Sequence, residues 1–488
     1  MSPLSLFAVA ALAQEPVPEE APVEGEPTEQ DVEEAAREAD IFGAPSTDVT
    51  AREADLFGAP DDEGDQPQPA GIPELEPTLS DADIAARLAE ADKRLTVGGL
   101  AYLRVDVGVP DVADLKGSDV TFASPNLLDL FVDARPNDRL RAFVRARATH
   151  ELTRQPTDID PITEEELEPT TIVLDQLWMN FDIAHRVFVT AGRQRIKWGA
   201  GRLWNPTDFL QPARLDALAF FDERTGVGLV KVHVPARPFN LYVIGDVEGA
   251  QAVDEIGAAA RLEAVFGLTE VAASYAARKE QPVRLGGEIT TGVWLVDFKG
   301  ELSVQQGVRT PGWEGELDFD ALILPTEVDR TTDIWLQALG GAEVGLRLND
   351  EDTLYLGGEY FYNQLGTDRV DLYPWLLFND QFTFFYVGQH YVGGYALLPG
   401  IGRGQPFNDM SWTASAIANL SDGTTALRLD YAVTVHTELS INAYVGTYLG
   451  DQGEFKLRVD VPGELVGGDD LLIPATLVST GLGMQLNF

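Results

Sequence analysis

The sequence contains no cysteine. This absence excludes disulfide bonds and thiolate metal ligands. Beyond the first residues there is also no run of about 18 apolar residues, so no membrane-spanning helix is expected. Basic residues are scarce, with 35 Lys and Arg against 79 Asp and Glu, and the formal charge of −44 argues against nucleic acid as a partner.

Residues typical of catalytic sites are also few. No His-Glu-x-x-His pattern and no serine nucleophile motif occur, and the glycine-rich stretch near residue 199 lacks the Gly-Lys-Ser/Thr of a phosphate-binding loop. We therefore predict no catalytic residue, no metal site and no cofactor. A hydrolase assembled across strands remains the least favoured alternative. The five histidines are scattered along the chain: His150, His185, His233, His390 and His436.

The C-terminal segment alternates strictly between apolar and polar or small side chains. Strict alternation with a period of two indicates a β-strand whose two faces meet different environments. The intervening positions carry Ser, Gly, Gln and Asn. The apolar face is formed by Val478, Leu482, Met484, Leu486 and Phe488, with Thr480 between them.

The same period of two recurs along most of the chain after residue 94. Tight turns, one of them expected at 298–300, separate these segments and alternate with longer loops. Short turns at one end and long loops at the other are typical of membrane barrels. We therefore predict an all-β fold, a transmembrane antiparallel up-and-down β-barrel over residues 94–488 with about eighteen strands, or sixteen as the alternative. Long loops are expected near 110–126, 151–170, 199–225, 310–330, 364–381 and 450–475.

The residues before the barrel form three segments. Residues 1–13 hold a short apolar stretch that ends in an Ala-x-Ala pattern, which predicts a signal peptide whose charged start is missing. Residues 14–80 are acidic and proline-rich, a composition that predicts a disordered leash. A short helix is expected over 81–93, opened by a weak capping box at Ser80.

The leash contains a repeat of nine residues that differs at one position. Arg37–Pro45 recurs as Arg52–Pro60, with Ile41 replaced by Leu56. An isolated apolar pair in an acidic leash is typical of a linear docking motif, so Phe42 and Phe57 are candidate docking residues for a periplasmic protein. The alternative is a duplicated spacer without a partner.

Four arginines, Arg139, Arg141, Arg145 and Arg147, share one face of a predicted strand. An arginine that faces lipid costs about 2–4 kcal/mol at mid-membrane, so this face is predicted to line the lumen. A second basic set follows at Arg193, Arg195 and Lys197, with Arg202 just beyond. Its phase depends on a bulge at Gly192, because Val187, Val189 and Ala191 are in the same register as Arg193.

The loop at 199–225 carries carboxylates, Asp208 and Asp216 among them. If this loop folds inward, its acids lie opposite the arginine face and form a constriction that selects solutes by size and charge. The alternative is a filled barrel in which Arg–Asp pairs, with Asp175 and Asp182 as candidates, only satisfy one another.

A dense motif spans the second basic set and the first part of this loop. It reads Gly-Arg-Gln from Gly192, then Trp198-Gly199, Gly201, and Trp204-Asn205-Pro206 before Asp208. The block resembles a signature of porin-like and alginate-export-like outer-membrane barrels of Gram-negative bacteria. The C-terminal strand with Phe488 likewise resembles the closing strand of these barrels. That resemblance implies contact with outer-membrane lipid and recognition by the barrel-assembly machinery through Phe488.

The resemblance and the alternation together predict an outer-membrane channel for passive, selective diffusion of small solutes, anions among them. The even strand number places the leash and the C-terminus in the periplasm. The competing hypothesis is a non-conducting scaffold, adhesin or assembly barrel that binds a periplasmic partner through the leash. The sequence fixes neither the transported solute nor the oligomeric state.

Overall fold

The computed structural model describes residues 94–488 except 138, 156, 159–165, 212, 220–221, 320, 322, 350–351, 401–408 and 462–470. The predicted signal peptide, leash, docking residues Phe42 and Phe57, and helix over 81–93 lie outside the described residues. No helix in the described part is long and apolar enough to cross a membrane.

Regular structure in the described part is almost entirely β. The long strands are β1 (Leu95–Pro110), β3 (Pro125–Asn137), β4 (Leu140–Glu151), β5 (Thr170–Ile183), β6 (Val187–Gln194), β7 (Val227–Ala236), β8 (Phe239–Asp246), β9 (Gly257–Phe266), β10 (Thr269–Ala277), β11 (Val283–Val293), β12 (Val296–Gln306), β15 (Ile334–Arg347), β16 (Thr353–Asn363), β17 (His390–Pro399), β18 (Met410–Asn419), β19 (Thr424–His436), β20 (Leu439–Leu449) and β23 (Thr476–Asn487). Short elements in the loops are β2 (Thr121–Ala123), η1 (Val253–Glu255), β13 (Gly312–Glu314), β14 (Thr326–Val328), η2 (Val370–Leu372), α5 (Tyr373–Phe378), β21 (Val459–Val461) and β22 (Leu471–Ile473).

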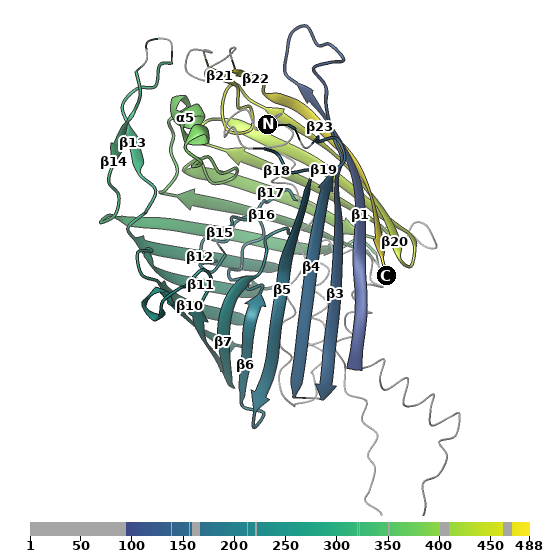
Figure 1. The fold of residues 1–488 in the computed structure, drawn as a ribbon, viewed down its shortest axis with the longest axis vertical. Coiled ribbons are helices and arrows are strands. Elements are labelled where there is room, and N and C mark those ends of the chain that lie inside the picture. The colour runs from purple at the N-terminus through teal and green to yellow at the C-terminus, as the bar shows by residue number, and fades with distance from the viewer. Residues whose placement is uncertain are drawn as a thin grey trace, which may run out of the picture.

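The long strands form a closed antiparallel barrel of 18 strands, which confirms the predicted fold class and strand number. Each long strand pairs with the next along the chain, and β23 closes the ring against β1 (Figure 1). The closing register runs from Leu100 opposite Asn487 to Val109 opposite Val478. Phe488 extends this pairing, because its amide and carbonyl exchange hydrogen bonds with Gly99 (3.0 and 2.7 Å).

The period-two pattern separates an outer apolar face from an inner polar face. On β1 the inward residues Arg104 and Asp106 are buried at 4% and 1% exposure, whereas the outward Leu103 and Val105 are 52% and 39% exposed. Successive side chains of a strand point to opposite faces, so this alternation follows directly from the sequence. The same outward phase on β23 carries Leu482, Leu486 and Phe488, all of them exposed. The barrel therefore presents a continuous apolar outer surface.

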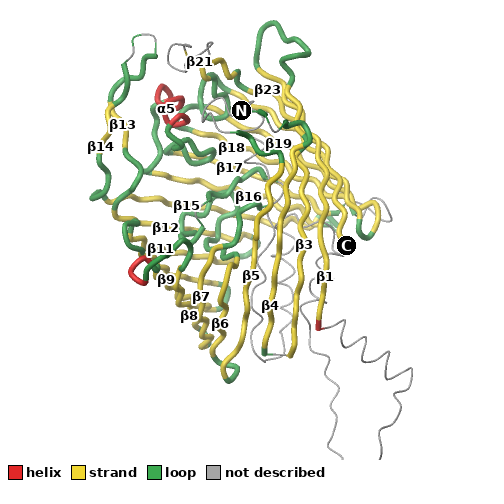
Figure 2. Tube along the Cα trace, in the orientation of Figure 1, coloured by secondary structure: helices red, strands yellow, loops and turns green. Residues whose placement is uncertain are grey.

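Most short turns and most long connections lie at opposite ends of the barrel (Figure 2). The exceptions are the ten-residue connection between β17 and β18 at the short-turn end and the four-residue turn between β18 and β19 at the loop end. The turns after β5, β7, β9 and β11 span two or three residues, and they lie at the end where β1 begins and β23 ends. The expected turn at 298–300 is wrong, because these residues lie inside β12. The chain turns at Trp294 and Leu295 instead, and Trp294 adopts a left-handed φ of 61° there.

Candidate functional site

The connection between β6 and β7, residues 195–226, contacts the inner face of the strands across the barrel, and we term it the inward loop. Its first anchor is Glu301 of β12. The Glu301 carboxylate accepts hydrogen bonds from the amides of Gly201 (2.7 Å) and Thr207 (3.3 Å) and from the Thr207 hydroxyl (2.7 Å). Only 4% of Glu301 is exposed. These three hydrogen bonds from the loop to one buried carboxyl group fix the loop to the wall.

A second anchor lies two strands away, at Glu359 of β16. Its carboxylate accepts the amides of Arg202 (2.6 Å) and Leu203 (2.9 Å). It also forms a salt bridge with Lys299 of β12, with 3.0 Å between Nζ and Oε1. Two carboxyl groups thus bind the same stretch of the loop, residues 201–207, and Lys299 compensates the charge of Glu359.

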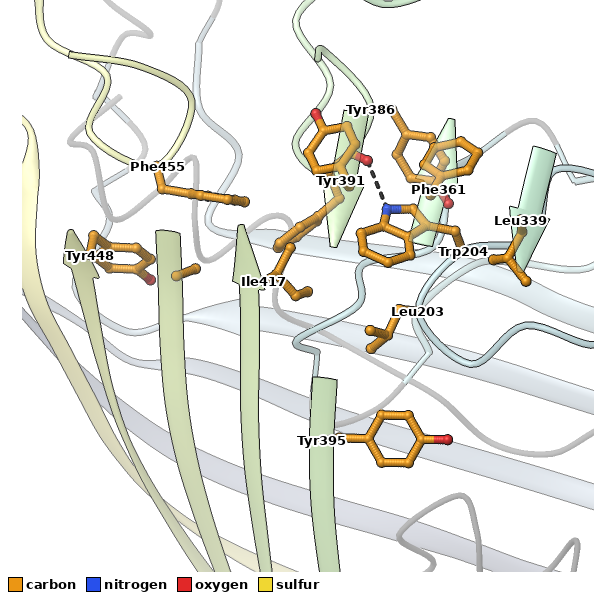
Figure 3. Close-up of a cluster of buried hydrophobic side chains, with 12 residues drawn as sticks. Leu203, Trp204, Leu339, Phe361, Tyr386, Tyr391, Tyr395, Ile417, Tyr448 and Phe455 are labelled. Carbon is orange, nitrogen blue, oxygen red and sulfur yellow. Dashed lines mark hydrogen bonds between the residues drawn. The ribbon is translucent and has the colours of Figure 1, made fainter. Parts of the chain in front are cut away.

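Trp204 provides the apolar contact between the inward loop and the wall. Its side chain is completely buried and stacks on Phe361 of β16 with 5.5 Å between ring centres. The indole nitrogen donates a hydrogen bond of 2.9 Å to the carbonyl of Phe385, which belongs to the β16–β17 connection (Figure 3). Leu203 of the inward loop belongs to the same buried cluster. The remaining residues come from strands β15 to β20 and the connections between them and β23: Leu339, Tyr386, Tyr391, Tyr395, Ile417, Ala426, Tyr448 and Phe455.

The glycines of the sequence motif allow the loop to fold back on itself. Gly199 has a left-handed φ of 102°, and a Cβ there would lie 2.7 Å from Asn205 Oδ1. A Cβ on Gly201 would lie 2.0 Å from the carbonyl oxygen of Trp204. Neither position can therefore accommodate a side chain without moving the loop. Pro206 follows as a buried residue of the same turn.

Trp198 lies near the start of the inward loop and is also buried. Its ring packs edge-to-face on Phe209 with 6.3 Å between centres, and the Arg261 guanidinium lies 5.7 Å from its ring centre. Asn205 is 3% exposed, and its side-chain amide has no hydrogen-bond partner in the described part of the chain. The motif of the sequence is thus buried inside the barrel, where it anchors the inward loop.

Ion pairs inside the inward loop hold its second half against the first. The Arg224 guanidinium donates a hydrogen bond of 3.0 Å to Asp208. It also donates hydrogen bonds of 2.6–2.9 Å from two of its nitrogens to the carboxylate of Asp222. Burial raises the pKa of Asp208 to about 6, although Arg224 opposes this shift. Burial and the charge of Arg224 lower the pKa of Lys197 to about 8. Lys197 and Asp208 are therefore parts of one compact charge cluster.

The second half of the inward loop is more accessible than the first. Residues 203–211 are all buried, whereas Asp216 and Glu223 are partly exposed. Burial raises the pKa of Asp216 to about 6, against the attraction of Arg428 and Arg104 on the barrel wall. Burial raises the pKa of Glu223 to about 8, with Arg147 as the strongest opposing charge. The loop acids therefore face arginines of the wall.

The predicted arginine face on β4 points inward, and its members are largely paired. Arg147 makes two hydrogen bonds of 2.8 Å to Asp129 of β3, and both side chains are almost fully buried. Arg141 bonds Asp133 at 2.9 Å and lies 5.1 Å from the ring centre of Trp178. These pairs match the alternative in which arginines and aspartates satisfy one another.

The other two arginines of this face differ. Arg139 lies beside the β3–β4 turn, is half exposed, and bonds Asp182 at 3.0 Å. Arg145 lies over the rings of Phe131 and Phe143, at 6.0 and 5.5 Å from their centres. The four arginines thus share a face but not an environment.

The second basic set is divided by the register of β6. The β5–β6 pairing continues without a shift through Gly192, so Arg193 stays opposite the outward-facing Leu177. Arg193 bonds Glu248 at 2.7 Å at the end of the strand, which corrects its assignment to the lumen lining. Arg195 lies beyond the strand, is buried, and pairs with Asp175 at 2.9 Å. Arg202 stacks on Tyr395, with its guanidinium 4.5 Å from the ring centre.

Several residues of the site were not found by sequence reasoning. Glu301 and Glu359 anchor the inward loop, Arg214 is part of it, and Arg284 of β11 lies beside it. Isolated acids in strands of period two indicate an inward position, but their partners are about a hundred residues away along the chain. Within the described ranges, no group of three or more His, Asp or Glu is arranged to hold a metal ion.

Comparisons with known proteins found no matching family model and no matching curated protein. Among solved structures, OccAB1 of Acinetobacter baumannii is similar with a TM-score of 0.48 and 8% identity, over 81% of this chain and 96% of that chain. A mutant of the Rhodopseudomonas blastica porin has a TM-score of 0.39 and 10% sequence identity. The match covers 81% of this chain and 100% of the porin chain. OmpTdeltaL8, a loop-deletion mutant of an outer membrane protein of Vibrio cholerae, has a TM-score of 0.35 and 11% sequence identity. The match covers 81% of this chain and 100% of that chain.

Proposed function

We propose that this protein is an outer-membrane channel for passive diffusion of small solutes, and that the inward loop sets the width and charge of its passage. The single observation that carries the proposal is the anchoring of residues 195–226 to the inner wall through Glu301, Glu359 and Trp204. Barrels of this strand number enclose more space than their own side chains fill. A loop folded into that space narrows it without closing the ring of strands.

The apolar outer surface supports the membrane location. Large apolar side chains alternate with buried polar ones on strand after strand, and the apolar ones are on the exposed side. Such a surface is stable in lipid and unfavourable in water. In this proposal the short turns, the leash and the C-terminus are periplasmic. The leash then reaches a periplasmic partner through Phe42 and Phe57, and the assembly machinery reads Phe488.

The passage runs between the accessible half of the inward loop and the wall of β1, β4 and β19. Asp216 and Glu223 lie on the inward loop. The arginines that attract them lie on the wall, at Arg104 of β1, Arg147 of β4 and Arg428 of β19. Each of the three wall arginines is paired with an aspartate, so ionisation of the two loop acids adds negative charge on one side of the passage and gives it a transverse field. No step of this activity needs a cofactor or turnover, because the gradient of the solute drives its movement.

A non-conducting barrel is the competing function. In it the inward loop and the β16–β17 connection together fill the lumen, and the protein acts as a scaffold. The stacking of Trp204 on Phe361 and its hydrogen bond to the Phe385 carbonyl are compatible with both functions. Conductance separates the two, because a filled barrel carries no ions.

The test is planar-bilayer recording of the purified full chain and of two matched tryptophan variants. Trp204→Ala removes the buried anchor, at a cost of roughly 3–5 kcal/mol of packing, and should release the loop. We expect wild-type steps of uniform conductance and larger, noisier steps for Trp204→Ala. Trp294→Ala is the control, because Trp294 is 91% exposed in a turn at the other end of the barrel.

Absence of conductance from wild type and from Trp204→Ala would contradict the channel and favour the scaffold. Heat-modifiable migration on gels shows for each variant that the barrel has formed. A Trp204→Ala channel identical to wild type would leave the channel intact but would show that the loop is not its constriction.

A further inference from the structure

Three neighbouring turns at the short-turn end of the barrel expose large apolar side chains. They are the turns between β7 and β8, between β9 and β10, and between β11 and β12. Leu268, Trp294 and Leu295 form the tips of the last two turns and are 71%, 91% and 51% exposed. Phe239 and Phe266 extend this surface toward the first turn, and their rings meet edge to face with 6.2 Å between centres. We term these five residues the turn patch.

The backbones of these turns are connected to one another. The amide of Val265 donates a hydrogen bond of 3.1 Å to the carbonyl of Pro238, and the amide of Gly292 donates one of 3.1 Å to the carbonyl of Leu268. The turn patch is therefore one continuous surface and not a set of separate loops. Exposed apolar surfaces of this kind mark sites of association with a protein or a membrane.

Basic side chains border the turn patch. Arg186 lies in the turn before β6 and Arg237 lies in the turn before β8, and both residues are exposed. Neither forms a salt bridge with an acid of the described residues, in contrast to Arg139, which bonds Asp182. Apolar tips beside two guanidinium groups complement an apolar segment that also carries carboxylates.

The leash of this chain contains segments with that composition. The repeats at 37–45 and 52–60 each place a Glu and an Asp just before an apolar pair, Ile41–Phe42 in the first and Leu56–Phe57 in the second. Residues 14–80 as a whole contain twenty Asp and Glu and two basic residues. The charge of the leash is therefore opposite to that of the arginines beside the turn patch.

The repeats are also within reach of the turn patch. The described chain begins at Arg94, directly before β1, at the same end of the barrel as the patch. A ring of 18 strands about 4.8 Å apart and tilted by about 40° is about 35 Å wide. A chain without regular structure spans about 30–36 Å over the residues from Phe57 to Arg94. The tether therefore keeps the repeats at a high local concentration near the patch.

We propose that the turn patch is a docking surface for the leash of the same chain. The apolar pair of a repeat lies against Leu268 and Trp294, and its acids lie toward Arg186 and Arg237. The inference rests on one part of the proposed function, that the leash and the short turns are on the same side of the membrane. It adds the barrel itself as a binding partner of the repeats, and a periplasmic protein that binds them must displace this contact. Because the patch lies outside the lumen, docking leaves the conductance unchanged.

The absence of cysteine allows a disulfide test in the full chain. One cysteine replaces Ala44, which follows the apolar pair of the first repeat, and a second replaces Leu295 at the edge of the turn patch. The matched control combines Ala44→Cys with Thr437→Cys. Thr437 is an exposed residue of the two-residue turn between β19 and β20, at the same end of the barrel and closer to β1 along the ring than Leu295. Oxidation is followed in detergent and in lipid nanodiscs, and heat-modifiable migration selects folded barrels of each variant.

We expect the disulfide at residue 295 to form at least about tenfold faster than the disulfide at residue 437, although the tether alone favours residue 437. Replacing Phe42 and Phe57 by Ser should slow the reaction at residue 295 about tenfold and leave residue 437 unchanged. Burial of one large apolar side chain changes an equilibrium constant by about tenfold or more, which sets this expectation.

Equal rates at the two positions would overturn the docking surface, and so would a rate at residue 295 that does not depend on Phe42 and Phe57. A disulfide at residue 295 that forms in detergent but not in nanodiscs would also overturn it, because lipid then covers the turn patch. The measurement does not use conductance, so its outcome is independent of whether the barrel is a channel.

Discussion

The two sides of the lumen use their charges in different ways. On the side of β3 and β4, Arg147 and Arg141 are each bound by an aspartate of the neighbouring strand. On the far side, Glu301 accepts hydrogen bonds from the backbone of the inward loop. One side is therefore a wall of cross-strand pairs, and the other is a set of acidic anchors. The arginines that share one face of β4 in the sequence therefore do not by themselves determine the electric field in the lumen.

The paired side can be tested by removing one charge or both. Asp129→Asn leaves Arg147 without its partner and should shift the reversal potential toward anions. The interaction energy between a unit charge and a monovalent ion about 8 Å away in water is about 0.5 kcal/mol. An energy of this size changes the ratio of anion to cation permeability roughly twofold. The double variant Asp129→Asn with Arg147→Gln should restore the wild-type value, because the pair is neutral. Equal shifts in the single and the double variant would show that the pair does not set the local field.

The anchored side can be tested through a buried acid without a basic partner in the described part. Glu454, in the β20–β23 connection, accepts hydrogen bonds from Tyr391 (2.8 Å), Asn419 (2.9 Å) and the amide of Phe385. Burial raises its pKa to about 8, and the neighbouring Asp422 adds to the shift. The groups that face it are Asp422, Tyr391 and Tyr373.

Because the pKa of folded Glu454 lies above its usual value, the protonated form is the one that the folded loops favour. Its stabilisation is complete at low pH and is lost as the pH rises toward and through about 8. We expect current fluctuations of wild-type channels to increase modestly between pH 6 and pH 9. Glu454→Gln should show a flat profile over the same range, since its amide does not titrate. The same rise in both proteins would assign the effect to another group.

Sequence reasoning reached the architecture because a barrel is specified locally. Alternation such as that of β23 defines its strands, and the even alternation of turns and loops defines the ring. The turn at Trp294 was missed because an aromatic residue in a left-handed conformation is uncommon, while Gly300 in the middle of β12 carries the usual turn signal. Sequence rules for turns fail where the register of the neighbouring strands determines the position of the turn.

The site was predicted less completely, for a physical reason. The motif around Trp198 and Trp204 was located, and Arg139–Arg147 were placed on an inward face, but their partners depend on contacts across the barrel. Whether Arg147 is neutralised is decided by the register of β3 against β4. Whether Glu301 binds the inward loop is decided by a fold-back that begins at Gly199 and Gly201. Local patterns do not contain these pairings.

The most direct test of the central claim, that the inward loop borders the passage, uses the absence of cysteine from this chain. A single cysteine is introduced at Asp216, and single-channel current is recorded before and after a bulky, charged thiol reagent is added. The account predicts a stepwise fall in conductance on modification. A cysteine at Val253, which is 86% exposed in the β8–β9 connection, should be modified without a change in current. Complete modification at residue 216, verified by mass spectrometry, with an unchanged current would contradict the account.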